Sequence, residues 1–150
     1  MASASNVFVD TNVLLFAQDE RVPDKRAAAT RWLERCWRER LGRVSSQVLN
    51  ELYANLRRVA PRLDVQHARA MVRIYRAWQP WPVDDATVDG AWSLQDRYSL
   101  NYWDALIVAA AQVQGCEILL SEDLQHDQQI DGVRVINPFL IGPDVLDASA

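Results

Sequence analysis

The sequence contains little cysteine and no long apolar run. Its two cysteines, Cys36 and Cys116, stand far apart and lack the spacing of a metal-binding pair, so we expect both to be reduced packing residues. No apolar run approaches the roughly 20 residues that cross a bilayer, and residues 1–5 lack the basic and apolar parts of a secretory signal. We therefore expect a soluble, cytoplasmic protein that does not associate with a membrane.

The sequence is also short of positive charge. It has 16 basic and 20 acidic residues, which gives a formal net charge of −4. Such a chain does not attract nucleic acid as a whole, so any polyanion must be met by a local basic cluster. Fifteen of the 16 basic residues are arginine, which suits phosphate recognition because the guanidinium donates two parallel hydrogen bonds. A GC-rich coding sequence would produce the same excess.

Neither repeats nor low-complexity segments interrupt the 150 residues. The length and the 49% hydrophobic content suit one core, so we expect a single domain over residues 1–150, with an ordered core at about 5–140 and a short irregular C-terminal tail. Short β-like runs alternate with longer helical ones. This alternation predicts an α/β fold with a central, mostly parallel β-sheet flanked by helices.

Apolar periodicity and capping residues predict the individual elements. Strands are expected over 7–9, 43–45, 117–120 and 133–136, with a brief extended piece over 81–83. Helices are expected from Val13, over 26–40 with Gly42 as the C-terminal cap, from a capping Ser46 to just before Pro61, and over 65–78, 84–97 and 102–115.

Four acidic residues stand where this fold would gather them. Asp10 and Asp123 each follow a predicted strand, and the carboxyl ends of parallel strands share one edge of the sheet. Helices could bring Glu51 and Asp104 to the same edge. Four converging carboxylates repel one another unless a divalent cation neutralises them. An oxygen-only cluster favours Mg²⁺ or Mn²⁺ over zinc.

Each acid also has an ordinary structural explanation. Asp10 could cap the helix that follows it, and Asp104 could favour the positive end of its own helix. Glu51 could lie on a solvated helix face, and Asp123 could cap a turn. No single one of the four decides between a site and a surface.

The order and context of these acids are more specific. The segments that carry them are Val9-Asp10-Thr11-Asn12, Asn50-Glu51-Leu52-Tyr53, Tyr102-Trp103-Asp104-Ala105-Leu106-Ile107 and Leu119-Leu120-Ser121-Glu122-Asp123-Leu124-Gln125. In this order and at these spacings the chain resembles the PIN domain, and in particular the VapC-type toxins of bacterial toxin-antitoxin pairs. The resemblance extends from the first predicted strand to the last and implies a three-layer PIN-like fold.

The resemblance implies a metal-dependent endoribonuclease. It makes Asp10, Glu51, Asp104 and Asp123 the catalytic and metal-binding acids, with Mg²⁺ or Mn²⁺ as the cofactor. One or two metal ions fit this set, and water as the nucleophile would leave a 5′-phosphate and a 3′-hydroxyl.

The acids have polar neighbours in the same motifs. Thr11 matches a hydroxyl that the family keeps beside the first acid, and Asn12 and Ser121 match polar residues that orient ligands or water. Glu122, Asp123 and Asp127 crowd one turn, and neighbouring side chains at a strand end alternate faces. Asp123 fits the motif register, and Asp127 is a reserve ligand.

Two further partners follow from the resemblance. VapC-type toxins are homodimers that a VapB-type antitoxin inhibits by lying in a groove near the active site. We therefore expect an RNA substrate, a cognate antitoxin and a homodimer.

An acidic protein that cuts RNA needs a positive rim around its pocket. The residues expected to supply it are Arg69, Arg73 and Arg76 on one helical face and Arg57, Arg58 and Arg62 near the preceding helix end. Such runs are more commonly solvated surface. Trp78 and Trp81 could stack on bases, although packing is the commoner use, and His126 follows the acidic turn.

Three other functions compete with the toxin. A PIN-fold binding module without catalysis is disfavoured because all four acids are present. A PIN nuclease for RNA processing is disfavoured because the chain has no added RNA-binding domain. A haloacid-dehalogenase phosphatase would need a second aspartate where Asn12 stands.

Overall fold

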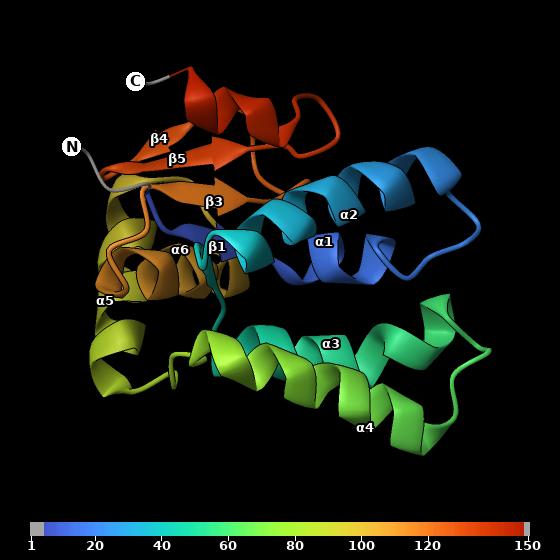
Figure 1. Cartoon of the computed structure of the whole chain (residues 1–150). Helices are drawn as coiled ribbons and strands as arrows, with labels where there is room; N and C mark the ends of the chain where they lie inside the picture. Colours follow the sequence, from blue (N-terminus) through green and yellow to red (C-terminus); the bar gives the residue numbers. More distant parts are fainter. Residues whose placement is uncertain (1–4, 149–150) are drawn as a thin grey trace.

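Five short strands form one sheet in the order β2-β1-β3-β5-β4 (Figure 1). The computed structural model describes residues 5–148. Its strands are β1 (Val7–Val9), β2 (Gly42–Arg43), β3 (Ile118–Leu120), β4 (Gln129–Ile130) and β5 (Val133–Ile136). All neighbours pair in parallel except β4, which runs antiparallel to β5. The expected mostly parallel sheet is confirmed, and β4, which is only two residues long, is an addition to the expected strands.

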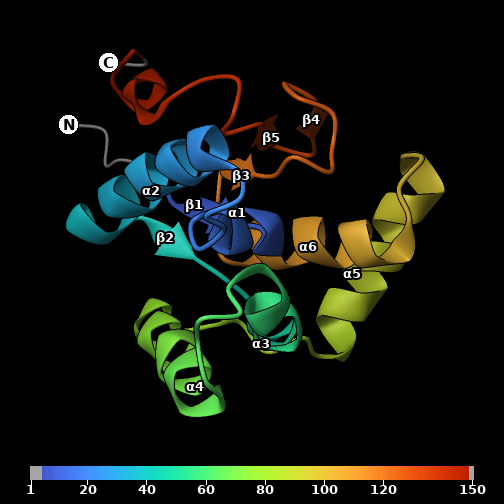
Figure 2. The ribbon, with the colours of Figure 1, turned by 90° about the vertical axis from the view of Figure 1, so that its right-hand side faces the viewer.

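Helices cover both faces of this sheet. In residues 5–148 they are α1 (Thr11–Phe16), α2 (Pro23–Arg38), α3 (Ser46–Val59), α4 (Val65–Ile74), α5 (Asp85–Arg97) and α6 (Tyr102–Val113), with 3-10 helices over Tyr75–Trp78 and Pro143–Asp147. Figure 2 shows α2 and the C-terminal 3-10 helix on one face and α1, α5 and α6 on the other. The helix α3 packs against α1 and α4, and α5 packs against α6. Within residues 5–148 the helices all lack the length or apolarity that crossing a bilayer requires.

Side-chain N-caps set the start of most helices. The capping residues are Asp10, Ser45, Asp64, Asp84 and Asn101, each of which accepts a hydrogen bond from a backbone N–H of its own helix. Several expected bounds need correction: α2 begins at Pro23 instead of residue 26, and the helix expected over 65–78 is α4 followed by the 3-10 helix Tyr75–Trp78. Ser45 caps α3 instead of Ser46, whose hydroxyl accepts from the Val83 backbone, and α1 starts at Thr11 because Asp10 is its cap.

The expectation that Gly42 caps the second helix is wrong. The helix α2 ends at Arg38, and Arg40 takes the left-handed conformation with φ 57°. Gly42 instead lies in β2, where a Cβ atom would stand 2.5 Å from the ring of Trp78. Trp78 is buried and contacts Trp37, with ring centroids 4.8 Å apart. The glycine therefore makes room for a tryptophan, which packs in the core as the commoner interpretation expected.

The C-terminal segment is more regular than the expected irregular tail. Residues Pro143–Asp147 form a 3-10 helix that lies against α2. The buried Trp32 donates its indole N–H to the Ile141 carbonyl at 3.0 Å, and Arg35 forms an ion pair with Asp147 at 2.6 Å. The segment thus closes the α2 side of the sheet.

The two cysteines have the structural role expected of them. Cys36 lies buried in α2 and Cys116 lies buried just before β3, and both are free thiols. Burial raises the pKa of each thiol to about 12, so neither is a ready nucleophile.

Candidate active site

The adjacent carboxyl ends of β1 and β3 form the base of the site. Asp10 follows β1, and its backbone N–H donates to the Leu120 carbonyl at 3.0 Å. Ser121 follows β3 and is fully buried. The two strand ends are therefore locked side by side, as the parallel-sheet rule predicts for a working edge.

All four predicted acids line one pocket of about 360 Å³. Its lining comes from the end of β1, from α3, from α6 and from the loop after β3, and consists of Asp10, Gln47, Glu51, Asn101, Trp103, Asp104, Ile107 and Asp123. The structure thus brings together residues that lie near opposite ends of the sequence, such as Asp10 and Asp123.

Asp10 is the most deeply held of the four acids, with 5% of its surface exposed. One carboxylate oxygen accepts from the Thr11 backbone N–H at 2.7 Å. The other accepts from the Ser121 hydroxyl at 2.8 Å and from the Asn12 amide at 3.3 Å. These donors fix the direction of a carboxylate that also caps α1.

Glu51 reaches the pocket from the middle of α3. Its carboxylate accepts from the Thr11 hydroxyl at 2.7 Å and from the Gln47 amide at 3.0 Å. Thr11 therefore touches the acids on both sides, through its backbone N–H to Asp10 and through its hydroxyl to Glu51.

Asp104 and Asp123 complete the rim of the pocket. Asp104 lies in the first turn of α6, where the capping Asn101 accepts from its backbone N–H at 2.9 Å and donates to its carboxylate at 2.8 Å. Asp123 accepts from the Asn12 amide at 3.1 Å, and its backbone N–H donates to the Ser121 hydroxyl at 3.1 Å. Asn12 and Ser121 thus connect the first acid with the fourth.

Burial and mutual repulsion raise the pKa values of two of these acids. Burial raises the pKa of Asp10 to about 7, and the negative charges of Asp123 and Glu51 add to the shift while hydrogen bonds from Ser121 and Thr11 oppose it. The pKa of Asp104 is also raised, first by burial and then by the charge of Asp123. Ionising Asp10 or Asp104 therefore costs more in this pocket than it would in water, chiefly because of burial.

The two other acids of the turn after β3 face elsewhere. Asp127 takes a left-handed conformation with φ 66°, and its carboxylate accepts from Arg134 at 2.6 Å. Glu122 pairs with Lys25. Neither lies in the lining of the acidic pocket, so Asp123 is the acid that the turn presents to it. His126 is half-buried and accepts from the Asn137 backbone N–H at 3.0 Å, which is a structural contact.

The chemistry of the donors fits a hard divalent cation, although the side chains do not form a ready-made site. Among residues 5–148, no group of three or more His, Cys, Asp or Glu side chains is arranged to hold a metal ion. Each carboxylate is turned to its own hydrogen-bond donors instead. Four carboxylates without a nearby His or Cys nevertheless offer the oxygen ligands that Mg²⁺ and Mn²⁺ prefer, and a cation would offset both the burial of the Asp10 carboxylate and the smaller repulsion from Asp123 and Glu51.

Sequence reasoning missed several residues of the pocket. Gln47 precedes Glu51 by one helical turn and so shares its face, a spacing that was visible in the sequence. Asn101 stands three residues before Asp104, which is the spacing of an N-cap to the third helical residue. Trp103 and Ile107 belong to the quoted motif, but nothing in the sequence alone places their side chains at the pocket wall.

Known proteins with this fold include toxins. No curated protein sequence matches the chain significantly. A chain of a toxin-antitoxin complex from Klebsiella pneumoniae is similar with a TM-score of 0.60 and 19% identity, covering 89% of this chain and 98% of that one. VapC20 of Mycobacterium tuberculosis, a toxin that cleaves the sarcin-ricin loop, has a TM-score of 0.56 and 20% identity over 76% of this chain and 87% of its own. VapBC2 from Rickettsia felis, bound to a DNA fragment from its promoter, gives 0.59 and 14% over 87% and 97%.

At these identities the solved structures establish a shared fold. The sequence evidence is more direct, because the family model of the PIN domain matches residues 7–129. That range begins at β1, ends in β4 and includes Asp10, Glu51, Asp104 and Asp123. The chain therefore belongs to the PIN-domain family.

Proposed function

We propose that this protein is a metal-dependent endoribonuclease that acts as the toxin of a toxin-antitoxin pair in the cytoplasm. The observation that carries the proposal is the pocket in which Asp10, Glu51, Asp104 and Asp123 meet at the carboxyl ends of β1 and β3. Its structural neighbours include a chain of a toxin-antitoxin complex and a toxin that cleaves the sarcin-ricin loop, and both support the same function.

The four carboxylates would hold Mg²⁺ or Mn²⁺. When bound, such an ion polarises a phosphodiester oxygen and lowers the pKa of a coordinated water. A carboxylate that is not fully engaged in binding the ion takes the proton of the attacking water. This hydrolysis leaves a 5′-phosphate and a 3′-hydroxyl.

The polar neighbours keep these carboxylates in place. Ser121 and the Thr11 backbone orient Asp10, the Thr11 hydroxyl and Gln47 orient Glu51, and Asn12 bridges toward Asp123. Because these donors come from three elements, they maintain the separation of the acids when the protein is free of metal.

Cleavage of total cellular RNA by purified, antitoxin-free protein tests the proposal. We expect discrete fragments with Mg²⁺ or Mn²⁺, none with chelator, and a loss of about 10²–10⁴-fold in Asp10→Asn and Asp104→Asn. Asp127→Asn is the matched control, since it removes a carboxylate of the same turn that is paired with Arg134 outside the pocket. A folded protein that cuts no RNA in either metal would contradict the enzyme and favour the non-catalytic binding module.

The partners are a separate part of the proposal. A toxin is expected to form a homodimer and to bind a VapB-type antitoxin encoded beside it, and co-expression of that antitoxin should restore the growth of cells that produce the toxin. A nuclease of RNA processing would instead leave growth unaffected when it is produced alone. The measurement is colony formation with and without the neighbouring open reading frame.

A further inference from the structure

Three pockets follow one another along α3. The acidic pocket shares Gln47, Glu51 and Trp103 with a second pocket of about 560 Å³. The second pocket shares Ser46 and Asn50 with a third of about 510 Å³. The shared walls make one continuous depression that starts at the proposed catalytic acids.

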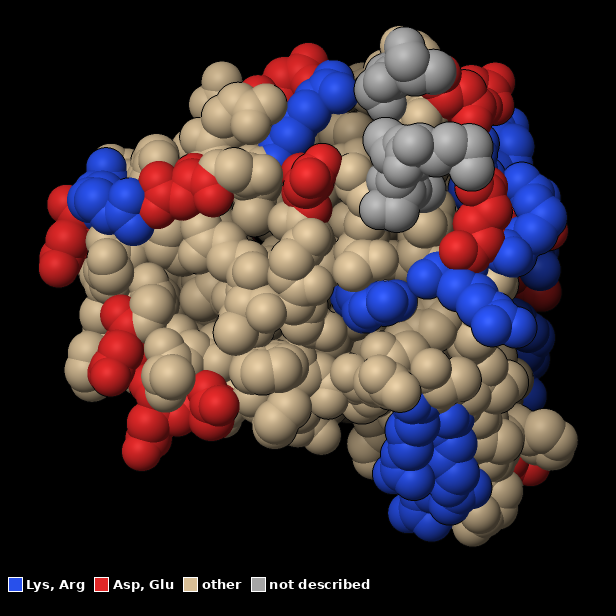
Figure 3. Space-filling model, turned by 60° about the vertical axis from the view of Figure 1, so that its left-hand side comes forward, with Lys and Arg blue, Asp and Glu red and all other residues tan. Residues whose placement is uncertain are grey.

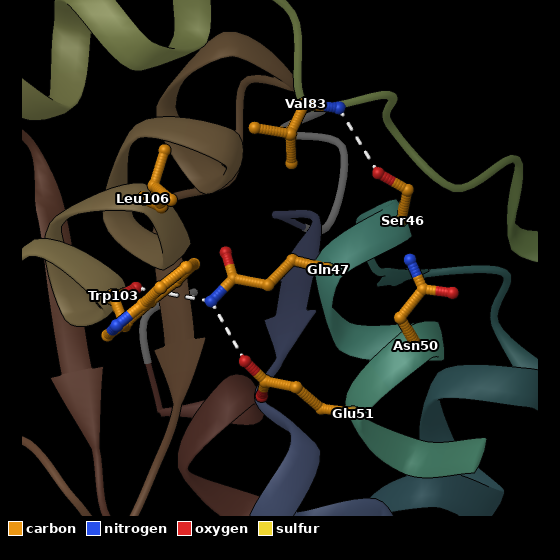
Figure 4. A pocket seen from close by; sticks show the side chains of 7 residues that line it. All are labelled: Ser46, Gln47, Asn50, Glu51, Val83, Trp103 and Leu106. Carbon is orange, nitrogen blue, oxygen red and sulfur yellow. Dashed lines mark hydrogen bonds between the residues drawn. The ribbon is translucent and has the colours of Figure 1, made fainter. Parts of the chain in front are cut away.

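The middle pocket has an aromatic wall and one unsatisfied acceptor (Figure 4). Its walls include Val83, Leu106 and the indole of Trp103, which is 63% exposed. The Gln47 amide nitrogen donates to Glu51 at 3.0 Å and to the Trp103 carbonyl at 3.4 Å. These two acceptors fix the orientation of the amide, so its oxygen points away from Glu51 toward the space between Leu106 and Val83.

That oxygen needs a partner from outside the chain. It is buried and accepts no hydrogen bond from any residue in the range 5–148. Buried acceptors are normally satisfied, so a water or a ligand that donates an N–H or O–H would complete this site. A nucleobase offers both required features, a flat face for stacking and an N–H on its edge.

The third pocket supplies positive charge. It is lined by Arg69, which donates to the Tyr53 hydroxyl at 3.1 Å, and by Arg73 and Arg76, whose side chains form no ion pair or hydrogen bond within residues 5–148. Figure 3 shows a compact blue patch at the bottom of the molecule, at the height of α3 and α4 in Figure 1. In a chain with a net charge of −4, unpaired arginines beside a groove are a local site for phosphate.

The other predicted arginine cluster is less available. Arg62 pairs with Glu20 and donates to Gln18, and Arg57 donates to the Leu63 carbonyl. Arg58 also forms no ion pair or hydrogen bond within residues 5–148 but does not line the depression, whereas the unpaired Arg73 on α4 and Arg76 on the 3-10 helix after it do.

We propose that this depression binds single-stranded RNA, with one unpaired base stacked on Trp103 against the Gln47 oxygen and the neighbouring phosphates held by Arg69, Arg73 and Arg76. The inference rests on the proposed nuclease function and extends it by assigning the residues that position the strand. The acidic pocket, the aromatic wall and the arginines follow one another along the depression. This order matches a scissile phosphate, a neighbouring base and a flanking phosphate along an RNA strand. A double helix is excluded as a substrate at this place, because its bases are paired and stacked.

The test measures RNA binding without cleavage. The probe is a fluorescein-labelled single-stranded RNA of about 12 nucleotides, titrated with Asp104→Asn protein in Mg²⁺. We expect Trp103→Ala in this background to weaken binding about tenfold or more and Trp103→Phe, which keeps an aromatic face, to restore most of it. Arg73→Gln with Arg76→Gln should weaken binding to a similar extent, and the duplex of the same sequence should bind poorly.

Matched controls remove a tryptophan and two arginines from surfaces outside the depression. Trp92→Ala removes a tryptophan of α5 that is 55% exposed but lies outside the depression, and Arg31→Gln with Arg38→Gln removes the same charge from exposed positions of α2. Neither should change the affinity by more than about twofold. In protein with all four acids, the Trp103 and arginine variants should raise KM, whereas Trp92→Ala and Arg31→Gln with Arg38→Gln should leave both KM and kcat within about twofold of wild type.

The possible outcomes distinguish a failure of the RNA-binding proposal from a failure of the proposed nuclease function. Cleavage with unchanged KM and affinity in all these variants would overturn the RNA path and leave the nuclease standing. Loss of a dimer on Trp103→Ala, seen by light scattering, or weaker binding of an antitoxin with unchanged binding of RNA, would also overturn it in favour of a protein interface. Binding that depends on Trp103 and the arginines in a protein that cuts no RNA would support the path and contradict the nuclease.

Discussion

At the scale of single residues, two of the acids combine an ordinary structural role with a place in the pocket. Asp10 caps α1 and lines the pocket, and Asp104 lies in the first turn of α6 and lines the same pocket. The structural role fixes the direction of each carboxylate, which is what a binding site requires. Capping signals in the sequence therefore do not count against a site.

The buried carboxyl of Asp10 gives the metal-free protein a distinctive pH dependence. Its pKa rises from 3.8 to about 7 on folding, so between these values the folded protein holds a proton that the unfolded chain has lost. Stability must then fall as the pH rises from about 4 to about 7, by up to about 1.4 kcal/mol per pH unit. In chelator, Asp10→Asn should become more stable than wild type across this range.

Urea unfolding of both proteins at several pH values measures this difference. Asp127→Asn supplies a control of opposite sign, because Arg134 lowers the pKa of Asp127 and its contribution is present above the unfolded pKa and lost as the pH falls. A constant gap between Asp10→Asn and wild type from pH 4 to pH 8 would mean that burial does not shift the pKa of Asp10.

At the scale of elements, local signals predicted the starts of several helices well but predicted the role of Gly42 wrongly. Capping residues and apolar spacing are local properties, so the starts of α3, α5 and α6 fall within one residue of expectation. Gly42 looked like a helix cap because it follows a helix. A glycine is needed at position 42 because the Trp78 ring packs against it. Trp78 comes from a distant part of the chain, so the residues next to Gly42 in the sequence do not indicate this contact.

Gly42→Ala should therefore destabilise the protein. The added Cβ would stand 2.5 Å from ring atoms of Trp78, and relieving that overlap costs roughly 1–3 kcal/mol in a packed core. Gly90→Ala in α5 is the matched control, since its Cβ would meet only Ala109 at an ordinary 3.7 Å and should stabilise the helix by up to about 1 kcal/mol. Thermal unfolding distinguishes the two, and equal melting temperatures would refute the packing argument.

At the scale of the whole molecule, the sequence constrained half of the site more firmly than the rest. Asp10 and Asp123 follow strands, and parallel strands fix where their carboxyl ends meet. Glu51 and Asp104 come from helices, whose positions depend on how α3 packs on α1 and α6 on the sheet. No local pattern contains that packing, so only the family resemblance linked these two acids to the others.

The position of the C-terminal segment likewise depends on packing that no local pattern contains. Because the segment closes the α2 side of the sheet, it should be required for full stability. A chain ending at Pro138 would remove the Ile141 carbonyl from the buried Trp32 indole and the Phe139 ring from Phe16, whose centroids lie 5.1 Å apart. The lost hydrogen bond and the lost aromatic pair together cost about 1–3 kcal/mol. We expect urea unfolding to show this loss while Mg²⁺-dependent RNA cleavage per folded molecule is retained.

A double-mutant cycle with Trp32→Phe locates the effect. Phenylalanine has no N–H to bond the Ile141 carbonyl, so the truncation should cost less in that background than in wild type, by roughly the 0.5–1.5 kcal/mol of one hydrogen bond. Identical losses in both backgrounds would show that the segment stabilises the protein through other contacts, such as the ion pair between Arg35 and Asp147. Asp147→Asn in the full-length chain measures that pair separately, because Arg35 also pairs with Glu39 and donates to the Pro143 carbonyl. If the hydrogen bond to Ile141 dominates, the Asp147 variant should lose less than half of what the truncation loses.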